Sequence, residues 1–247
     1  MPLPDLTETL LAAAAALILG VLKTSVGGGI GLTLTPLLSL VMPPSAVLGL
    51  LGCQMVLSDP MSIYLYWRQW DARLLRILLP ASLAGIVLGA WMLSGLSETG
   101  LRRLIGASAL FMGALSLVAL LRVPRGYSQA SAPAGLAVGL GAGVASIVAN
   151  SGGIILGPYL AGLGLGTAVV VGTGQAVVMC ANLLKLAAYG AIGFITWHLA
   201  LLAVITTPLL YLGTSLGYRL NARIPRRALA LALIVIAVAG GLKLVLP

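Results

Sequence analysis

Residues 24–31 of the chain read TSVGGGIG, and residues 148–155 read VANSGGII. Each stretch interrupts an apolar segment, 6–42 or 133–165, that is too long for one crossing, since about 20 residues at about 1.5 Å each span the hydrocarbon of a bilayer. A glycine cluster destabilises a helix and permits the backbone to turn back. Each segment is therefore predicted to be either a broken crossing or a re-entrant hairpin.

The rest of the chain is equally apolar. Of its 247 residues, 60% are hydrophobic and only 8% are charged, which is too little polar surface to cover a soluble fold. The stretches that meet or approach the length of a membrane-spanning helix are 6–22, 44–66, 73–93, 100–121, 166–190, 197–219 and 225–246. We therefore predict an all-α membrane protein without a sizeable soluble domain.

Further matches indicate that the chain is a duplicated unit. One spacing of a proline and two glycines occurs twice, as Pro80, Gly85 and Gly89 and then as Pro208, Gly213 and Gly217. Gln54 in the first half likewise matches Gln175 in the second. We predict a first membrane repeat over 1–124, a linker over 125–130 and a second membrane repeat over 131–247. Internal repeats of this kind are typical of secondary transporters.

The loop charges favour the hairpin interpretation. If both glycine-interrupted segments cross the membrane once, the loop arginines and lysines divide evenly between its two sides. If both segments turn back, nearly all share one side, and only Arg102, Arg103 and Lys243 lie opposite. The positive-inside rule selects the second arrangement. Each half then has one hairpin and three crossings, so the repeats are inverted and both termini are predicted to be non-cytoplasmic.

Ionisable side chains are costly inside a bilayer and are usually kept for function. The predicted membrane segments contain Lys23, Asp59 and Lys185. Lys185 shares a polar stripe at helical spacing with Gln175 and Asn182, and such a stripe lines a pathway or makes hydrogen bonds between helices. Lys23 either attracts an anion or extends its long side chain to the nearest water.

Asp59 has two interpretations that the sequence leaves open. A carboxylate that can bind and release a proton inside the membrane is the proton-coupling candidate of a carrier. The alternative is a fixed ion pair with Lys23 or Lys185.

The glycine clusters are the other candidate site. A helix that begins after Gly29 or Gly153 presents free backbone N–H groups and a positive dipole end, which bind anions, whereas close helix packing is the alternative use of glycine. The predicted substrate-binding residues are Lys23, Ser25, Gly28, Gly29, Gln54, Asn150, Ser151, Gly152, Gly153, Gln175, Asn182 and Lys185.

The two glycine motifs resemble those of the TauE/SafE family of membrane permeases. The matching residues are GGGIG at 27–31 with Pro36 and NSGGI at 150–154 with Pro158, and chain length and duplication agree. The resemblance implies a secondary transporter that exports small anionic sulfur compounds, sulfite or organosulfonates, across the cytoplasmic membrane. It also implies that an ion gradient, for which protons are our candidate, drives transport by alternating access.

The sequence gives little support to other classes of function. The net charge of +9 is spread over short loops rather than one face, which argues against nucleic acid as a partner. We find no zinc-ligand spacing, nucleophile elbow, P-loop or dinucleotide fingerprint, so neither an enzyme nor a bound metal or cofactor is expected. An anion channel and a membrane scaffold without transport activity are the alternatives. The identity of the anion and the existence of a homo-oligomer stay open.

Overall fold

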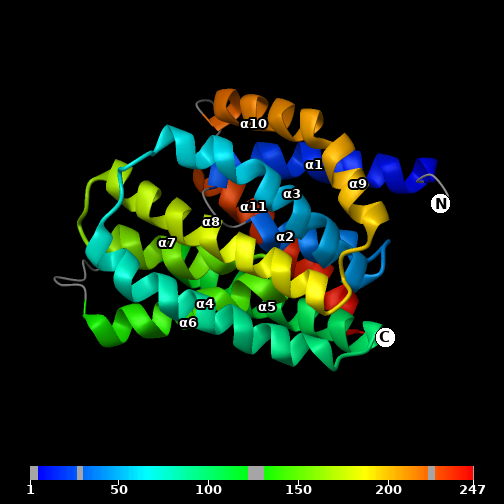
Figure 1. The fold of residues 1–247 in the computed structure, drawn as a ribbon, viewed down its shortest axis with the longest axis horizontal. Coiled ribbons are helices and arrows are strands. Elements are labelled where there is room, and N and C mark those ends of the chain that lie inside the picture. Colours follow the sequence, from blue (N-terminus) through cyan, green and yellow to red (C-terminus); the bar gives the residue numbers. More distant parts are fainter. Residues whose placement is uncertain (1–4, 27–29, 122–130, 222–225, 247) are drawn as a thin grey trace.

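The computed structural model describes residues 5–26, 30–121, 131–221 and 226–246, and within them it contains helices and no strand (Figure 1). The helices are α1 (Leu6–Val26), α2 (Ile30–Leu38), α3 (Pro44–Leu65), α4 (Ala72–Ser94), α5 (Glu98–Leu121), α6 (Ala132–Ala149), α7 (Gly152–Gly162), α8 (Thr167–Ala191), α9 (Trp197–Ile205), α10 (Thr207–Asn221) and α11 (Arg226–Val245). The predicted all-α class is confirmed.

Seven of the described helices are long and apolar enough to cross a membrane, and the bent pair α9 and α10 brings the number to as many as eight. The chain is therefore a multi-pass membrane protein. Figure 1 shows that α1 begins and α11 ends at the same end of the long axis of the molecule.

The stretch 197–219, expected as one straight span, is two helices bent by 47° at their junction. Thr206 lies at this junction, and its hydroxyl donates to the Leu202 carbonyl at 2.8 Å. Pro208 follows and has no N–H to donate to the preceding turn. Hydroxyl bonding to the preceding turn and a proline are both known causes of helix bending. Pro80, in the matching position of α4, lies inside an unbroken helix.

The second glycine-interrupted segment is a hairpin, because α7 runs back along α6. At the start of α7, a Cβ placed on Gly152 would lie 2.6 Å from the Ala142 carbonyl oxygen of α6. Gly135 lies near the start of α6. A Cβ placed on it would lie 3.3 Å from the hydroxyl of Tyr159, which is towards the end of α7. The contacts thus move towards the start of α6 as α7 proceeds. The hairpin predicted from loop charges is the arrangement that this segment adopts.

The first glycine-interrupted segment has the same two-helix composition. Leu34 and Leu38 of α2 belong to the same buried core as Leu19 and Leu22 of α1, and the two helices contact each other. Residues 27–29, which hold the first glycine cluster, lie outside the described residues. The choice between hairpin and broken crossing stays open in this half.

The most extensive helix contacts join the two halves of the sequence. α4 packs against α6 and α1 packs against α10, and these pairs occupy opposite edges of the molecule in Figure 1. A Cβ on Gly85 would lie 2.2 Å from the Leu140 carbonyl oxygen, and a Cβ on Gly213 would lie 2.2 Å from that of Leu17. The two glycines matched in the sequence thus make equivalent backbone approaches that no larger residue permits.

Between those edges, α3 and α8 cross the centre of the bundle in opposite directions. Met55 of α3 contacts Lys185 of α8, and Asp59 further along α3 contacts Asn182 further back on α8. Antiparallel packing of matched helices is the relation that inverted repeats require. The repeats and their boundaries stay a prediction, and the linker 125–130 lies outside the described residues.

Candidate functional site

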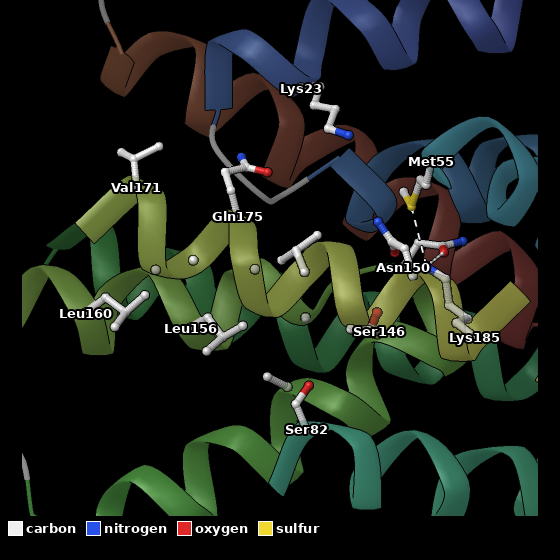
Figure 2. Close-up of a pocket in the computed structure, with 18 of the residues that line it drawn as sticks. Lys23, Met55, Ser82, Ser146, Asn150, Leu156, Leu160, Val171, Gln175 and Lys185 are labelled. Carbon is white, nitrogen blue, oxygen red and sulfur yellow. Dashed lines mark hydrogen bonds between the residues drawn. The ribbon is translucent and has the colours of Figure 1, made fainter. Parts of the chain in front are cut away.

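A cavity inside the bundle collects most of the polar residues expected to bind substrate. Its volume is about 150 Å³, which is room for on the order of ten water molecules. Figure 2 shows a polar end, where Lys185 and Asn150 meet, and a more apolar end at Leu156, Leu160 and Val171. Helices from both sequence halves line the cavity, with α6, α7 and α8 supplying most of its wall.

Lys185 of α8 carries the most deeply buried charge at the cavity. Its side chain is fully buried. The Nζ atom donates to Asn150 Oδ1 at 2.7 Å and lies 3.5 Å from Met55 Sδ. No carboxylate of the described residues lies within ion-pair distance of it. The ammonium group is thus oriented by neutral acceptors while its charge stays uncompensated.

Asn150 holds its amide at the tip of the α6–α7 hairpin. It ends α6 in the left-handed conformation, with φ 54°, which asparagine tolerates better than most residues. Its backbone N–H closes the last turn of α6 by donating to the Ser146 carbonyl at 2.9 Å. Its side-chain Nδ2 donates to Thr35 Oγ1 of α2 at 3.3 Å. The same side chain therefore links Lys185 to the other half of the sequence.

A second network ties α1, α3 and α8 together beside the cavity. Lys23 Nζ donates to Asp59 Oδ1 at 2.7 Å and to Ser58 Oγ at 2.5 Å. Asn182 Nδ2 donates to the other carboxylate oxygen of Asp59 at 2.9 Å. The ion-pair alternative for Asp59 is thus the one present in this structure, with Lys23 as its partner. Lys23 and Asn182 line the cavity, whereas Asp59 lies behind them.

The charges of this centre do not balance. Two lysine amino groups, those of Lys23 and Lys185, meet one carboxylate of the described residues, that of Asp59. When both amino groups are protonated, one positive charge inside the membrane-spanning part of the protein has no counter-charge, at the wall of a cavity. A small anion is the chemical species that would neutralise it.

The start of α7 adds backbone donors at the same end of the cavity. Gly152 and Gly153 line the cavity as the first residues of that helix, where backbone N–H groups have no partner within the helix. Gly152 also packs closely on α6, so close packing is a role that it has in this structure, while anion binding by its N–H stays a prediction. Ser151 directs its hydroxyl to the Ala149 carbonyl at 2.8 Å instead.

The sequence-predicted residues that line this cavity are Lys23, Asn150, Gly152, Gly153, Gln175, Asn182 and Lys185. Ser151 and Gln54 are buried but are not part of its wall. Gly28, Gly29 and the side chain of Ser25 lie outside the described residues.

Gln54 occupies a different environment from Gln175, its match in the second half. Its Nε2 donates to the Ala12 carbonyl at 3.1 Å and to Thr206 Oγ1 at 3.2 Å. Gln54 therefore joins α1 and α3 to the bend between α9 and α10. Its carbonyl oxygen is buried without a hydrogen-bond partner among the described residues.

Three contributors to the site were not predicted as site residues. Met55 lies four residues before Asp59 and shares its face of α3, so that face could have indicated Met55. Ser58 is adjacent to Asp59 in the sequence and shares no face with it by helical spacing. Thr35 gave no signal, because α2 meets the α6–α7 tip only in the folded chain. No cluster of three or more metal-ligating side chains occurs among the described residues.

Comparison with known proteins gives one match. Residues 12–244 match the family described as Sulfite exporter TauE/SafE. Neither the curated proteins nor the solved structures gave a match.

Proposed function

The chain belongs to the sulfite exporter TauE/SafE family, and from that premise we propose that it exports sulfite or organosulfonates across the cytoplasmic membrane. The family is one of membrane transporters, which agrees with the expectation of a transporter rather than an enzyme. The expected family resemblance is confirmed over nearly the whole chain.

The fully buried amino group of Lys185, which has no carboxylate partner among the described residues, is the observation that carries the proposal. Burying a charge in the membrane without a counter-ion is costly, and such residues usually mark a substrate or ion pathway. Lys185 is fully buried, faces the cavity and has neutral hydrogen-bond partners. An anion entering the cavity supplies the missing counter-charge, and its binding recovers part of the cost of burial.

We place the anion at the polar end of the cavity. Lys185 lies there beside Asn150, and Gly152 and Gly153 at the start of α7 line the same cavity. Oxyanions accept hydrogen bonds both from ammonium groups and from backbone N–H groups at a helix start. Lys23 contributes a second cation whose availability depends on Asp59. The site therefore binds a monoanion while Asp59 is paired with Lys23. When Asp59 releases Lys23, the site accepts a second negative charge.

We propose that Asp59 is also the coupling residue. Protonation of its carboxyl group would release Lys23 and Asn182, the two cavity-lining groups that it holds. Proton binding and anion binding would thereby favour each other, so a proton and a doubly charged anion would move together. The net negative charge of that pair would let an inside-negative membrane potential drive export. Access would alternate between sides of the membrane through two inverted halves whose termini are non-cytoplasmic.

Flux into proteoliposomes tests this function. Purified protein is reconstituted, and uptake of labelled sulfite or of an anionic alkylsulfonate is measured with and without an imposed pH gradient. We expect saturable accumulation driven by the gradient, loss of accumulation in Lys185→Ala, and flux uncoupled from protons in Asp59→Asn. Lys243→Ala, which removes an exposed lysine at the end of α11, is the matched control and should behave as the parent does.

The same assay separates the alternatives. An anion channel would give flux that neither saturates nor runs uphill. Parental behaviour of Lys185→Ala would refute the site, and absence of flux for every anion would favour a membrane scaffold.

A further inference from the structure

Two arginines at the start of α5 do not follow the positive-inside bias that the other loop arginines show. Arg102 and Arg103 lie opposite nearly all the other loop arginines in the topology that the positive-inside rule favours. Arg103 is exposed, and within the part of the chain that the structure describes its guanidinium has no hydrogen bond or ion pair. An arginine kept against the topological bias and without a protein partner calls for another ligand.

An apolar groove has Leu104, the residue after Arg103, in its wall. It has a volume of about 490 Å³ and lies between α4, α5 and α6, with Met92, Ala107, Phe111 and Val144 in its wall. Phe111 is 65% exposed. Because this groove is on the membrane-facing surface of a multi-pass protein, an apolar chain rather than water is its natural filling.

The helix register aligns the charge with the groove. Residues four apart share a face of an α-helix, so Arg103, Ala107 and Phe111 form one line along α5. Helical side chains lean towards the start of their helix, which carries the guanidinium towards the membrane surface. The line therefore has a cation at the interface and apolar side chains below it.

The same combination recurs on α11, which packs antiparallel to α5. A Cβ on Gly106 would touch Gly241, whereas one on Gly113 would touch Val238. Arg227 near the start of α11 precedes Ala230 and Ile234, which line a second apolar groove, of about 360 Å³. Because the two helices are antiparallel, the two arginines lie at opposite ends of the bundle.

We propose that the groove between α4, α5 and α6 binds an anionic phospholipid, with its phosphate on Arg103 and an acyl chain against Ala107, Phe111 and Val144. Arginine suits the phosphate because it donates two parallel hydrogen bonds and keeps its charge. Basic residues beside grooves between membrane helices are a known basis for lipid recognition. This site is separate from the proposed anion cavity.

The bound lipid would also support the α6–α7 hairpin. Val148 and Ala149 before the tip and Ile155 after it line the groove, so an acyl chain contacts both arms beside Asn150. A lipid bound in this groove would therefore stabilise the hairpin that holds Asn150, the hydrogen-bond acceptor of Lys185.

Native mass spectrometry of the detergent-purified full chain tests the proposal. Dissociation constants are measured for dioleoyl phosphatidylglycerol and dioleoyl phosphatidylcholine added separately. We expect phosphatidylglycerol to bind the parent more tightly and Arg103→Gln to weaken that binding about tenfold. Arg102→Gln removes the same charge one residue away on another face of α5, and it should keep the parent's affinity.

A second variant fills the groove without strain. A Cβ on Gly141 would meet only Ile155 Cδ1, at 3.7 Å, so Gly141→Leu should fold and should weaken binding of both lipids. Gly190→Leu is its control, because a Cβ on Gly190 meets nothing within 4 Å and Gly190 does not line the groove. Equal affinity for the two lipids, or equal losses in Arg102→Gln and Arg103→Gln, would overturn the proposal. So would a dimer in the same spectra that Gly141→Leu dissociates, since a second copy would then occupy the groove.

Discussion

Two breaks in the helices of this protein have similar surroundings but differ in what they do. The α6–α7 tip presents Asn150 to the fully buried Lys185 and borders the cavity. The α9–α10 bend presents Thr206 to the fully buried Gln54, and neither residue lines that cavity. Both breaks are polar and buried. If the proposed site is correct, the comparison teaches that a broken membrane helix forms a binding site where a buried amino group without a carboxylate partner and free volume coincide, and otherwise serves as a joint.

The largest expected effect concerns the charge network beside the tip. Asp59→Asn leaves Lys23 without a counter-charge at a side-chain exposure of 9%. The free energy of unfolding, measured by denaturant titration in micelles, should fall by about 3–5 kcal/mol, because breaking a buried pair strands the other charge. The double variant Lys23→Met with Asp59→Asn should recover most of the loss. An Asp59→Asn protein as stable as the parent would show that the pair contributes nothing at this break.

A smaller effect should separate the two roles of Asn150. Asn150→Gly keeps the left-handed backbone, so anion affinity should fall about tenfold through disorientation of Lys185 while stability changes by less than about 1 kcal/mol. Asn150→Ala should lose the same affinity and a further ~1 kcal/mol of stability, because alanine disfavours φ 54°. Affinity is measured by anion-dependent thermal shift. Parental affinity in Asn150→Gly would remove the tip from the site.

The smallest effect is expected at the α9–α10 bend. Gln54→Leu removes a buried carbonyl oxygen that has no partner among the described residues, together with two hydrogen bonds. These terms nearly cancel, so stability should change by less than about 1 kcal/mol and flux by less than about twofold. Gln175→Leu, at the cavity wall, is the matched comparison and should weaken anion binding. If Gln54→Leu abolished transport, the bend would have to be counted as part of the site.

The sequence predicted the hairpin and its charges well because both signals are local. Glycine clusters interrupt helices wherever they occur, and a lysine inside an apolar segment is conspicuous without a structure. The contact between Lys185 and Asn150 was beyond reach, since the two lie on different helices.

Repeat matching succeeded for backbone approaches and failed for side-chain environments. Gly85 and Gly213 were matched and make equivalent contacts. Wherever two helix backbones cross this closely, the residue at the crossing must lack a side chain. Gln54 and Gln175 were also matched, yet Gln175 alone lines the cavity. Pro80 and Pro208 differ similarly, since the bend at Pro208 also depends on the hydroxyl of Thr206.

The glycine crossings bear on which parts can move as rigid bodies. Backbones that approach as closely as those at Gly85 and Gly143 in one pair, and at Gly20 and Gly213 in the other, leave no room to slide without collision. We expect α4 to travel with α6, and α1 with α10. Each moving body would then contain one helix from each half of the chain, so the mechanical units of the protein would be interleaved rather than equal to its two sequence halves.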